Sequence, residues 1–309
     1  MSDLRLSLFL PSSEVKKSEA SIVVRMSRRP EPADDARTVY DALDHAGQLV
    51  CSLKWDGDRY HWHYPGLANY LVPPDGARIY WAPESENLAD IAAAAAGPVL
   101  GFALQLQGLV CLHGSAVVHE GKAYALVAPS TFGKSTTAAA LMARGCKLLT
   151  DGCIALDASG PEVTVLPGPA TMKLVPETLS RLYPGTEWEK SPRLASWLEK
   201  RVVTAHDLGG TYDEPAPLAS ISVLLPALPE RDVEVKRLTG PEALLRLIGN
   251  SYNARQLARE PELQGRQMEV FSRIVEQTQV NAVLAPRSLD RLGELTGAIL
   301  AGAPAASAV

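Results

Sequence analysis

The stretch APSTFGKST, residues 128–136, is where residue type and spacing point most directly to chemistry. It approaches the phosphate-binding pattern G-x-x-x-x-G-K-[ST], with Ala128 in place of the first glycine. In that pattern Gly133 lets the backbone approach the phosphates, Lys134 reaches the β- and γ-phosphates, and Ser135 places its hydroxyl on Mg²⁺. Because these contacts do not depend on Ala128, we expect nucleotide binding, and a chance or degenerate match is the alternative.

The loop as a whole is expected to wrap a phosphate chain in backbone N–H groups at the start of a helix, where the helix dipole favours negative charge. The residues expected to bind the nucleotide are Ser130, Thr131, Phe132, Gly133, Lys134, Ser135 and Thr136.

Two further side chains could complete the chemistry. Asp151 ends the apolar run KLLTD, which a neighbouring strand could bring to the loop. Its carboxylate could hold Mg²⁺ or take the proton from an attacking hydroxyl, and we favour the base because Ser135 already supplies a metal ligand. The alternative is an ordinary acid at a strand-end turn. His113, in LHGS, either approaches the same site or is a histidine of the core or of a turn.

Other potential metal ligands lack the spacing of a site. His61 and His63 lie two residues apart on one expected strand, and without a third ligand nearby they are interpreted as surface residues. The four cysteines have no C-x-x-C spacing, which favours reduced thiols.

The elements around the loop follow the order that a phosphate-binding loop requires. The chain reads as a strand (AYALVA), the loop, a helix (STTAAALMARG) ending at Gly145, and a second strand (KLLTD). Before this, residues 1–86 contain short alternating runs and turn residues, which predicts a β-rich N-terminal region. Asn87 would then cap a helix, so we expect the α/β domain to span residues 87–309.

Two segments allow more than one interpretation. Residues 91–112 are nearly free of charge and about long enough for a membrane span, but Gly97-Pro98 and two glutamines favour a buried helix. Residues 187–213 are charged and have no clear period, so they form either a mobile or substrate-facing segment or an ordinary solvated helix.

Composition excludes some partners. The net charge of -5 gives no basic field for a nucleic acid, and no membrane partner is expected. The start, MSDLRLSLFLPSSE, has Asp3 where a signal peptide needs basic residues, so a cytoplasmic location is expected.

The run from residue 112 to residue 156 resembles the core of the HPr kinase/phosphorylase family, in which a histidine, a phosphate loop, a helix ending in Arg-Gly and an acidic strand end follow in this order. PATMKLVPETLSRL, PLASISVLLP and NAVLAPRSLDRLGELTGAI look like later segments of HPr-kinase-like proteins, including kinases of lasso-peptide gene clusters. The resemblance implies a P-loop-containing α/β fold and a kinase that passes a phosphoryl group from ATP, or another nucleoside triphosphate, to a serine hydroxyl with Mg²⁺.

By position, the resemblance assigns Ser135 and Asp151 to the metal, Asp151 and His113 to catalysis, and Lys173 as a weaker phosphate contact. It implies a peptide or small protein as partner and a homo-oligomeric assembly. The bifunctional members carry a second acid where Gly152 stands, so we expect no efficient phosphorylase activity. Their second signature, a glycine-rich segment after the acidic pair, has no convincing copy in this sequence, so a lasso-peptide precursor or another peptide serine fits better than HPr itself as the substrate. A kinase of a small-molecule hydroxyl and a nucleotide-binding regulator with little transfer activity are the alternatives.

Overall fold

The computed structural model describes residues 23–26, 31–185, 187–195 and 198–302. The N-terminal stretch that we expect not to be a signal peptide lies outside these residues. The chain forms two compact units, one made of Met1–Cys111 with Tyr252–Met268 and the other of Leu112–Ser251 with Glu269–Val309. The first unit therefore takes in the helical segment after residue 87 and a later part of the chain, both of which the sequence analysis places with the α/β domain.

The first unit is built on a six-stranded sheet in the order β1-β6-β5-β4-β3-β2. Neighbouring strands are antiparallel except β1 and β6, which run parallel. Its core includes the fully buried rings of Trp62, Tyr70 and Trp81. The strands are β1 Val23–Met26, β2 Arg37–Leu43, β3 Leu49–Trp55, β4 Tyr60–Tyr64, β5 Ala68–Val72 and β6 Arg78–Pro83.

The apolar segment that follows is helical and packs into this core through Ile91, Val99 and Phe102. It consists of α1 Leu88–Ala94, a π-helical turn Ala95–Val99 and α2 Leu100–Leu106, and Gly97 inside the turn has non-helical backbone angles. The Asn87 side chain accepts hydrogen bonds from the N–H groups of Ala89 and Asp90, as expected for an N-cap. By length and composition Leu88–Leu106 could cross a membrane, and half of its most apolar window is buried within the protein.

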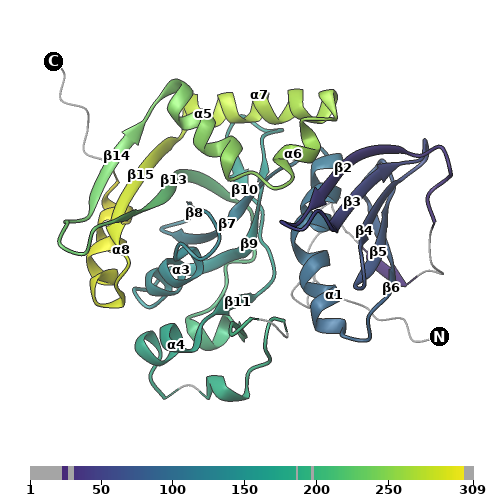
Figure 1. Ribbon diagram of the computed structural model, residues 1–309. Helices are drawn as coiled ribbons and strands as arrows, with labels where there is room; N and C mark the ends of the chain where they lie inside the picture. The colour runs from purple at the N-terminus through teal and green to yellow at the C-terminus, as the bar shows by residue number, and fades with distance from the viewer. Residues whose placement is uncertain (1–22, 27–30, 186, 196–197, 303–309) are drawn as a thin grey trace. The chain divides into compact units, whose positions relative to one another are not determined.

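The second unit contains a seven-stranded sheet in the order β10-β9-β7-β8-β13-β15-β14 (Figure 1). Strand β13 runs parallel to both β8 and β15, while β7 and β8, β9 and β10, β10 and β13, and β14 and β15 pair antiparallel. The strands are β7 Val110–His119, β8 Lys122–Val127, β9 Lys147–Asp157, β10 Thr164–Val165, β13 Ala216–Ala227, β14 Glu234–Leu238 and β15 Gln279–Pro286.

Helices α3 Lys134–Met142 and α8 Leu292–Ala301 pack together in the core of the second unit with Leu126 of β8 and Leu224 of β13. Three consecutive alanines, residues 138–140, let α3 lie close to the sheet, because they add little side-chain volume. Gly145 follows α3 with a positive φ of 96°, which ends the helix where the sequence predicts. The other α-helices are α4 Pro176–Leu182, α5 Gly240–Gly249, α6 Ala254–Leu257 and α7 Pro261–Gln277, and the unit boundary falls within α7.

Residues 187–213 do not form a solvated helix in the described part of the chain. They contain two short 3₁₀ turns, Trp188–Lys190 and His206–Leu208, and strand β12 Arg201–Thr204, which pairs with β11 Thr171–Leu174. The pairing fixes β12 beside Lys173, so part of this segment belongs to the surroundings of the candidate site.

Candidate functional site

The glycine-lysine loop joins the end of β8 to the start of α3 (Figure 1). Gly133 is the N-cap of α3 with φ 86°, a conformation that glycine adopts without strain. No side chain caps this helix terminus, so its first N–H groups are available to an anion. Ala128 is fully buried at the start of the loop, and its φ is not among the positive ones, so the missing first glycine is accommodated.

Lys134 points back into the loop. Its Nζ donates to the backbone oxygens of Ala128 at 2.9 Å and Pro129 at 3.1 Å, and the residue is 7% exposed. The ammonium group is thus held inside the loop by two backbone oxygens.

The Asp151 carboxylate connects the loop to two strands. Its Oδ1 accepts from the hydroxyls of Ser135 at 2.8 Å and Ser115 at 2.6 Å, and its Oδ2 accepts from the backbone N–H of Lys173 at 2.9 Å. The structure therefore brings Asp151 to the loop. The expectation that Asp151 ends its strand is wrong, however. Asp151 lies inside β9, which continues past it through Gly152 to Asp157.

Strand β7 supplies His113 and Ser115, which share one face of the strand because side chains alternate. Gly114 between them faces the opposite side, where an added Cβ would lie 2.4 Å from the Leu126 carbonyl oxygen and 2.5 Å from the Ile154 side chain. Sequence reasoning missed Ser115, although the same alternation already places it beside His113.

Lys173 of β11 adds a second ammonium group near the carboxylate. Gly152 has φ 109°, and a Cβ on it would lie 2.8 Å from Lys173 Nζ, so the lysine side chain passes over this glycine. Lys200, just before β12, is close enough for its positive charge to lower the pKa of both Lys134 and His113. Nothing in the sequence pattern singles out Lys200, because β12 reaches the site by a long-range pairing.

The protonation of two groups follows from this setting. Burial lowers the pKa of Lys134 to about 8, with Lys200 acting in the same direction and Asp151 opposing it. Burial also lowers the pKa of His113 to about 4, helped by nearby lysines. At neutral pH Lys134 is mostly charged, whereas His113 is neutral.

The remaining loop residues make different contacts. The Thr136 hydroxyl lies 3.2 Å from that of Thr178 in α4, and Phe132 packs against the core of the second unit. Thr131 has a positive φ of 68°. Ser130 is exposed on the loop.

The two histidines that the sequence analysis does not assign to a metal site, His61 and His63, make contacts with acidic side chains. His61 is buried rather than on the surface and lies 2.6 Å from Asp56, while His63 lies 3.1 Å from Glu84. Within the described ranges no group of three His, Cys, Asp or Glu side chains is placed to hold a metal ion. All four cysteines lie within the described residues, where they are buried and form no disulfide.

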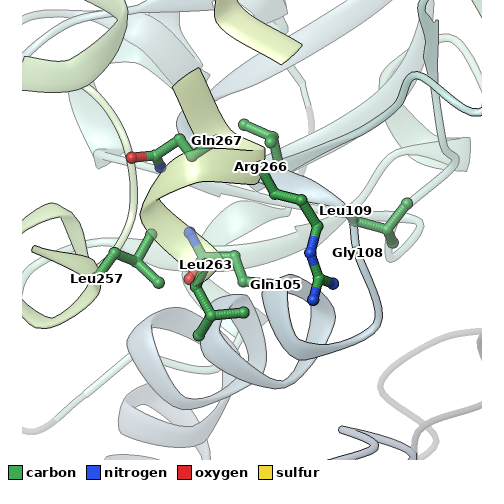
Figure 2. A pocket seen from close by; sticks show the side chains of 8 residues that line it. Gln105, Gly108, Leu109, Leu257, Leu263, Arg266 and Gln267 are labelled. Atoms are coloured by element: carbon green, nitrogen blue, oxygen red, sulfur yellow. The ribbon is translucent and has the colours of Figure 1, made fainter. Parts of the chain in front are cut away.

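A small hollow in the first unit is lined by residues from the end of α2, the segment that leads into β7, the end of α6 and the first turns of α7 (Figure 2). Arg266 and Gln267 border it with Gln105, but none of its lining residues is one that the sequence marks for chemistry. We assign it no role.

Together, the second unit and its site define an α/β fold in which a glycine-lysine loop joins a central strand to a helix and faces a carboxylate. No protein-family model matches the chain, and no curated protein matches it. Among solved structures it is similar to the HPr(Ser) kinase/phosphatase from Coxiella burnetii, with a TM-score of 0.33 and 12% identity over 60% of this chain and 91% of that one. A similarity at this TM-score assigns no role to the chain.

Proposed function

We propose that this protein is an ATP-dependent kinase that transfers a phosphoryl group to a serine hydroxyl of a peptide or protein. The observation that carries the proposal is the contact between the loop hydroxyl of Ser135 and the Asp151 carboxylate, 2.8 Å apart, beside a lysine held inside the loop. Phosphoryl transfer is catalysed mainly by positioning and by positive charge around the phosphates. Lys134 and the start of α3 supply both.

The oxygen atoms around Asp151 fit Mg²⁺. This ion prefers oxygen ligands and is usually bound by one or two carboxylates together with substrate phosphates. The Ser135 hydroxyl and the Asp151 carboxylate are such ligands, and they already converge. When bound, Mg²⁺ would neutralise charge on the phosphates. A single carboxylate suits an ion shared with the nucleotide rather than held by the protein alone.

The substrate hydroxyl that receives the phosphoryl group must lose its proton, so the site also needs a base. His113 is neutral at pH 7, and its pKa of about 4 makes it a weak base, so it is better suited to orienting a group by hydrogen bonding. Asp151 could take the proton, but both of its oxygens accept hydrogen bonds, and one of these would have to be released. The contact with Ser135 supports a role for Asp151 on the metal side of the reaction as well.

The acceptor class rests on sequence resemblance and on charge. Lys173 and Lys200 place positive charge near the loop in addition to Lys134. A serine at the C-terminus of a peptide carries a carboxylate next to its hydroxyl, which such lysines would attract. We therefore favour a C-terminal serine, as in a lasso-peptide precursor, over an internal one.

The test is transfer from Mg-ATP to short peptides ending in serine, with the C-terminus either free or amidated, followed by mass spectrometry. We expect phosphoserine on the free-acid peptide and little on the amide. Lys134→Ala should remove transfer while the fold remains. ATP binding without transfer to any peptide would favour a nucleotide-binding regulator, and transfer to small hydroxyl compounds instead would favour a small-molecule kinase.

A further inference from the structure

Arg287, the first residue after β15, contacts the glycine-lysine loop from far along the chain. Its Nη2 donates to the Thr131 carbonyl oxygen at 2.8 Å, and its guanidinium carbon lies 5.5 Å from the centre of the Phe132 ring. Arg287 is exposed, whereas Phe132 is half-buried and packs against the core. The loop therefore has an arginine lying over its aromatic residue.

The sheet explains why these residues meet. Because β13 runs parallel to both β8 and β15, the carboxyl ends of the three strands lie at the same edge. The glycine-lysine loop follows β8 and Arg287 follows β15. In open α/β sheets, ligands bind outside the carboxyl ends of the parallel strands. Arg287 is thus on the side of the sheet where a nucleotide held by the loop must lie.

The hydrogen bond to Thr131 occupies one of the several N–H donors of the Arg287 guanidinium group. Thr131 has φ 68°, an uncommon conformation for a β-branched residue, and the hydrogen bond from Arg287 helps to hold it. A guanidinium has five N–H donors and two flat faces. The hydrogen bond to the Thr131 carbonyl uses one of these donors, and the guanidinium carbon lies over the Phe132 ring.

We propose that Arg287, supported by Phe132, is the surface on which the base of the nucleotide stacks. This inference rests on the proposed binding of a nucleotide by the loop. The phosphates account for the ammonium of Lys134 and the N–H groups of α3, whereas the base is a flat aromatic ring that needs a flat partner. Arginine stacks on aromatic rings through its planar group, and such stacking tolerates different bases. The site would therefore take purine nucleotides with little discrimination between adenine and guanine.

The experiment compares binding of Mg-ATP and of Mg-tripolyphosphate, which lacks the nucleoside, by calorimetry. The variants are Arg287→Ala, Arg287→Lys and the matched control Arg237→Ala, an exposed arginine on β14. We expect both Arg287 variants to bind ATP at least about 5-fold more weakly, the lower end of what base stacking contributes, with tripolyphosphate affinity unchanged. The control should match the wild-type protein.

Two results would overturn the inference. Equal losses for ATP and tripolyphosphate would show that Arg287 acts on the loop alone, and unchanged ATP affinity in Arg287→Ala would show that it makes no contact with the nucleotide. If the wild-type protein bound neither ligand, the proposed kinase function would fail together with the inference. If instead the wild-type protein binds tripolyphosphate and ATP but the Arg287 variants lose nothing specific to ATP, only the inference about the base fails.

Discussion

The Asp151 carboxylate receives hydrogen bonds from three elements, the loop at Ser135, β7 at Ser115 and β11 at Lys173. An asparagine in its place can turn its oxygen toward the Lys173 N–H and its amide toward the two hydroxyls, which can accept. The variant Asp151→Asn should therefore fold, while it loses the negative charge. This makes it suited to separating the roles of base and metal ligand.

We expect Asp151→Asn to transfer at least about 100-fold more slowly in single-turnover assays, because general-base help is worth ~10² to 10⁴ in rate. If ATP affinity stays normal, Asp151 acts as the base. If affinity falls and added Mg²⁺ restores part of the rate, it holds the metal, and the contact with Ser135 leads us to expect this contribution as well. Asp157→Asn, at the end of the same strand, is the control, and an Asp151→Asn enzyme unchanged in both measurements would remove Asp151 from the site.

Lys134 predicts a pH dependence of nucleotide binding. Its pKa is lowered to about 8, so it is charged below that pH and neutral above it. ATP affinity should therefore fall as pH rises through about 8, because the positive charge facing the phosphates is lost. In Lys200→Ala the pKa of Lys134 should rise, since a neighbouring positive charge is gone, and the midpoint should move to higher pH. The exposed Lys190→Ala is the control, and an unmoved midpoint in Lys200→Ala would contradict the coupling.

His113 predicts a pH dependence of stability with a definite sign. Its pKa is lowered in the folded protein from 6.5 to about 4, so between these values the unfolded chain binds the proton and the folded protein does not. The stability due to neutral His113 is complete above pH 6.5 and is lost as pH falls toward 4, in total on the order of 3 kcal/mol. His113→Gln should lack this loss. Hydrogen exchange of β7 amides at pH 7 and pH 5 measures it, with the exposed His206→Gln as control.

At the scale of elements, the sequence predicts what is encoded locally. The strand, loop and helix from Lys122 to Met142 follow from adjacent residues, and the Asn87 cap and the end of α3 near Gly145 depend on single residues. Two of the three donors to Asp151, Ser115 and the Lys173 N–H, could not be predicted in the same way. Ser115 and Lys173 reach it through strand pairing and packing between distant segments, which no local period records.

The continuation of β9 past Asp151 depends on Gly152, whose φ of 109° is strained for any other residue. We expect Gly152→Ala to destabilise the second unit by about 1–3 kcal/mol, because alanine must adopt this backbone conformation and displace the end of Lys173. Gly160→Ala is the matched control, since its φ is not in that region and its new Cβ would keep 3.8 Å from the nearest atom. Urea denaturation followed by circular dichroism compares the two variants, and equal stability would show that β9 tolerates a side chain there.

At the scale of the molecule, the chain leaves the first unit at Cys111 and returns to it at Tyr252. The returning segment makes specific contacts with the N-terminal sheet. Leu257 is 1% exposed in the core of that unit, and Glu260 forms an ion pair with Arg37 at 2.6 Å and accepts from the Tyr60 hydroxyl at 3.3 Å. The predicted boundary at residue 87 follows a change in the sequence pattern. The core of the first unit continues beyond that residue and includes part of a segment far along the chain, Tyr252–Met268, which the local pattern does not indicate.

The importance of the returning segment can be measured through Leu257. Leu257→Ala removes a buried side chain and leaves a cavity, so we expect the free energy of unfolding of the first unit to fall by about 2–5 kcal/mol. Trp62 and Trp81 are buried in the same core, so tryptophan fluorescence during urea denaturation reports on this unit in a background in which Trp188 and Trp197 of the second unit are replaced by phenylalanine. The control is Leu43→Ala in β2, because Leu43 is 61% exposed and its removal should change the midpoint little. If Leu257→Ala unfolded like the control, the segment from residue 252 to residue 268 would not be part of the core, and the first unit would be stabilised by its N-terminal strands and helices alone.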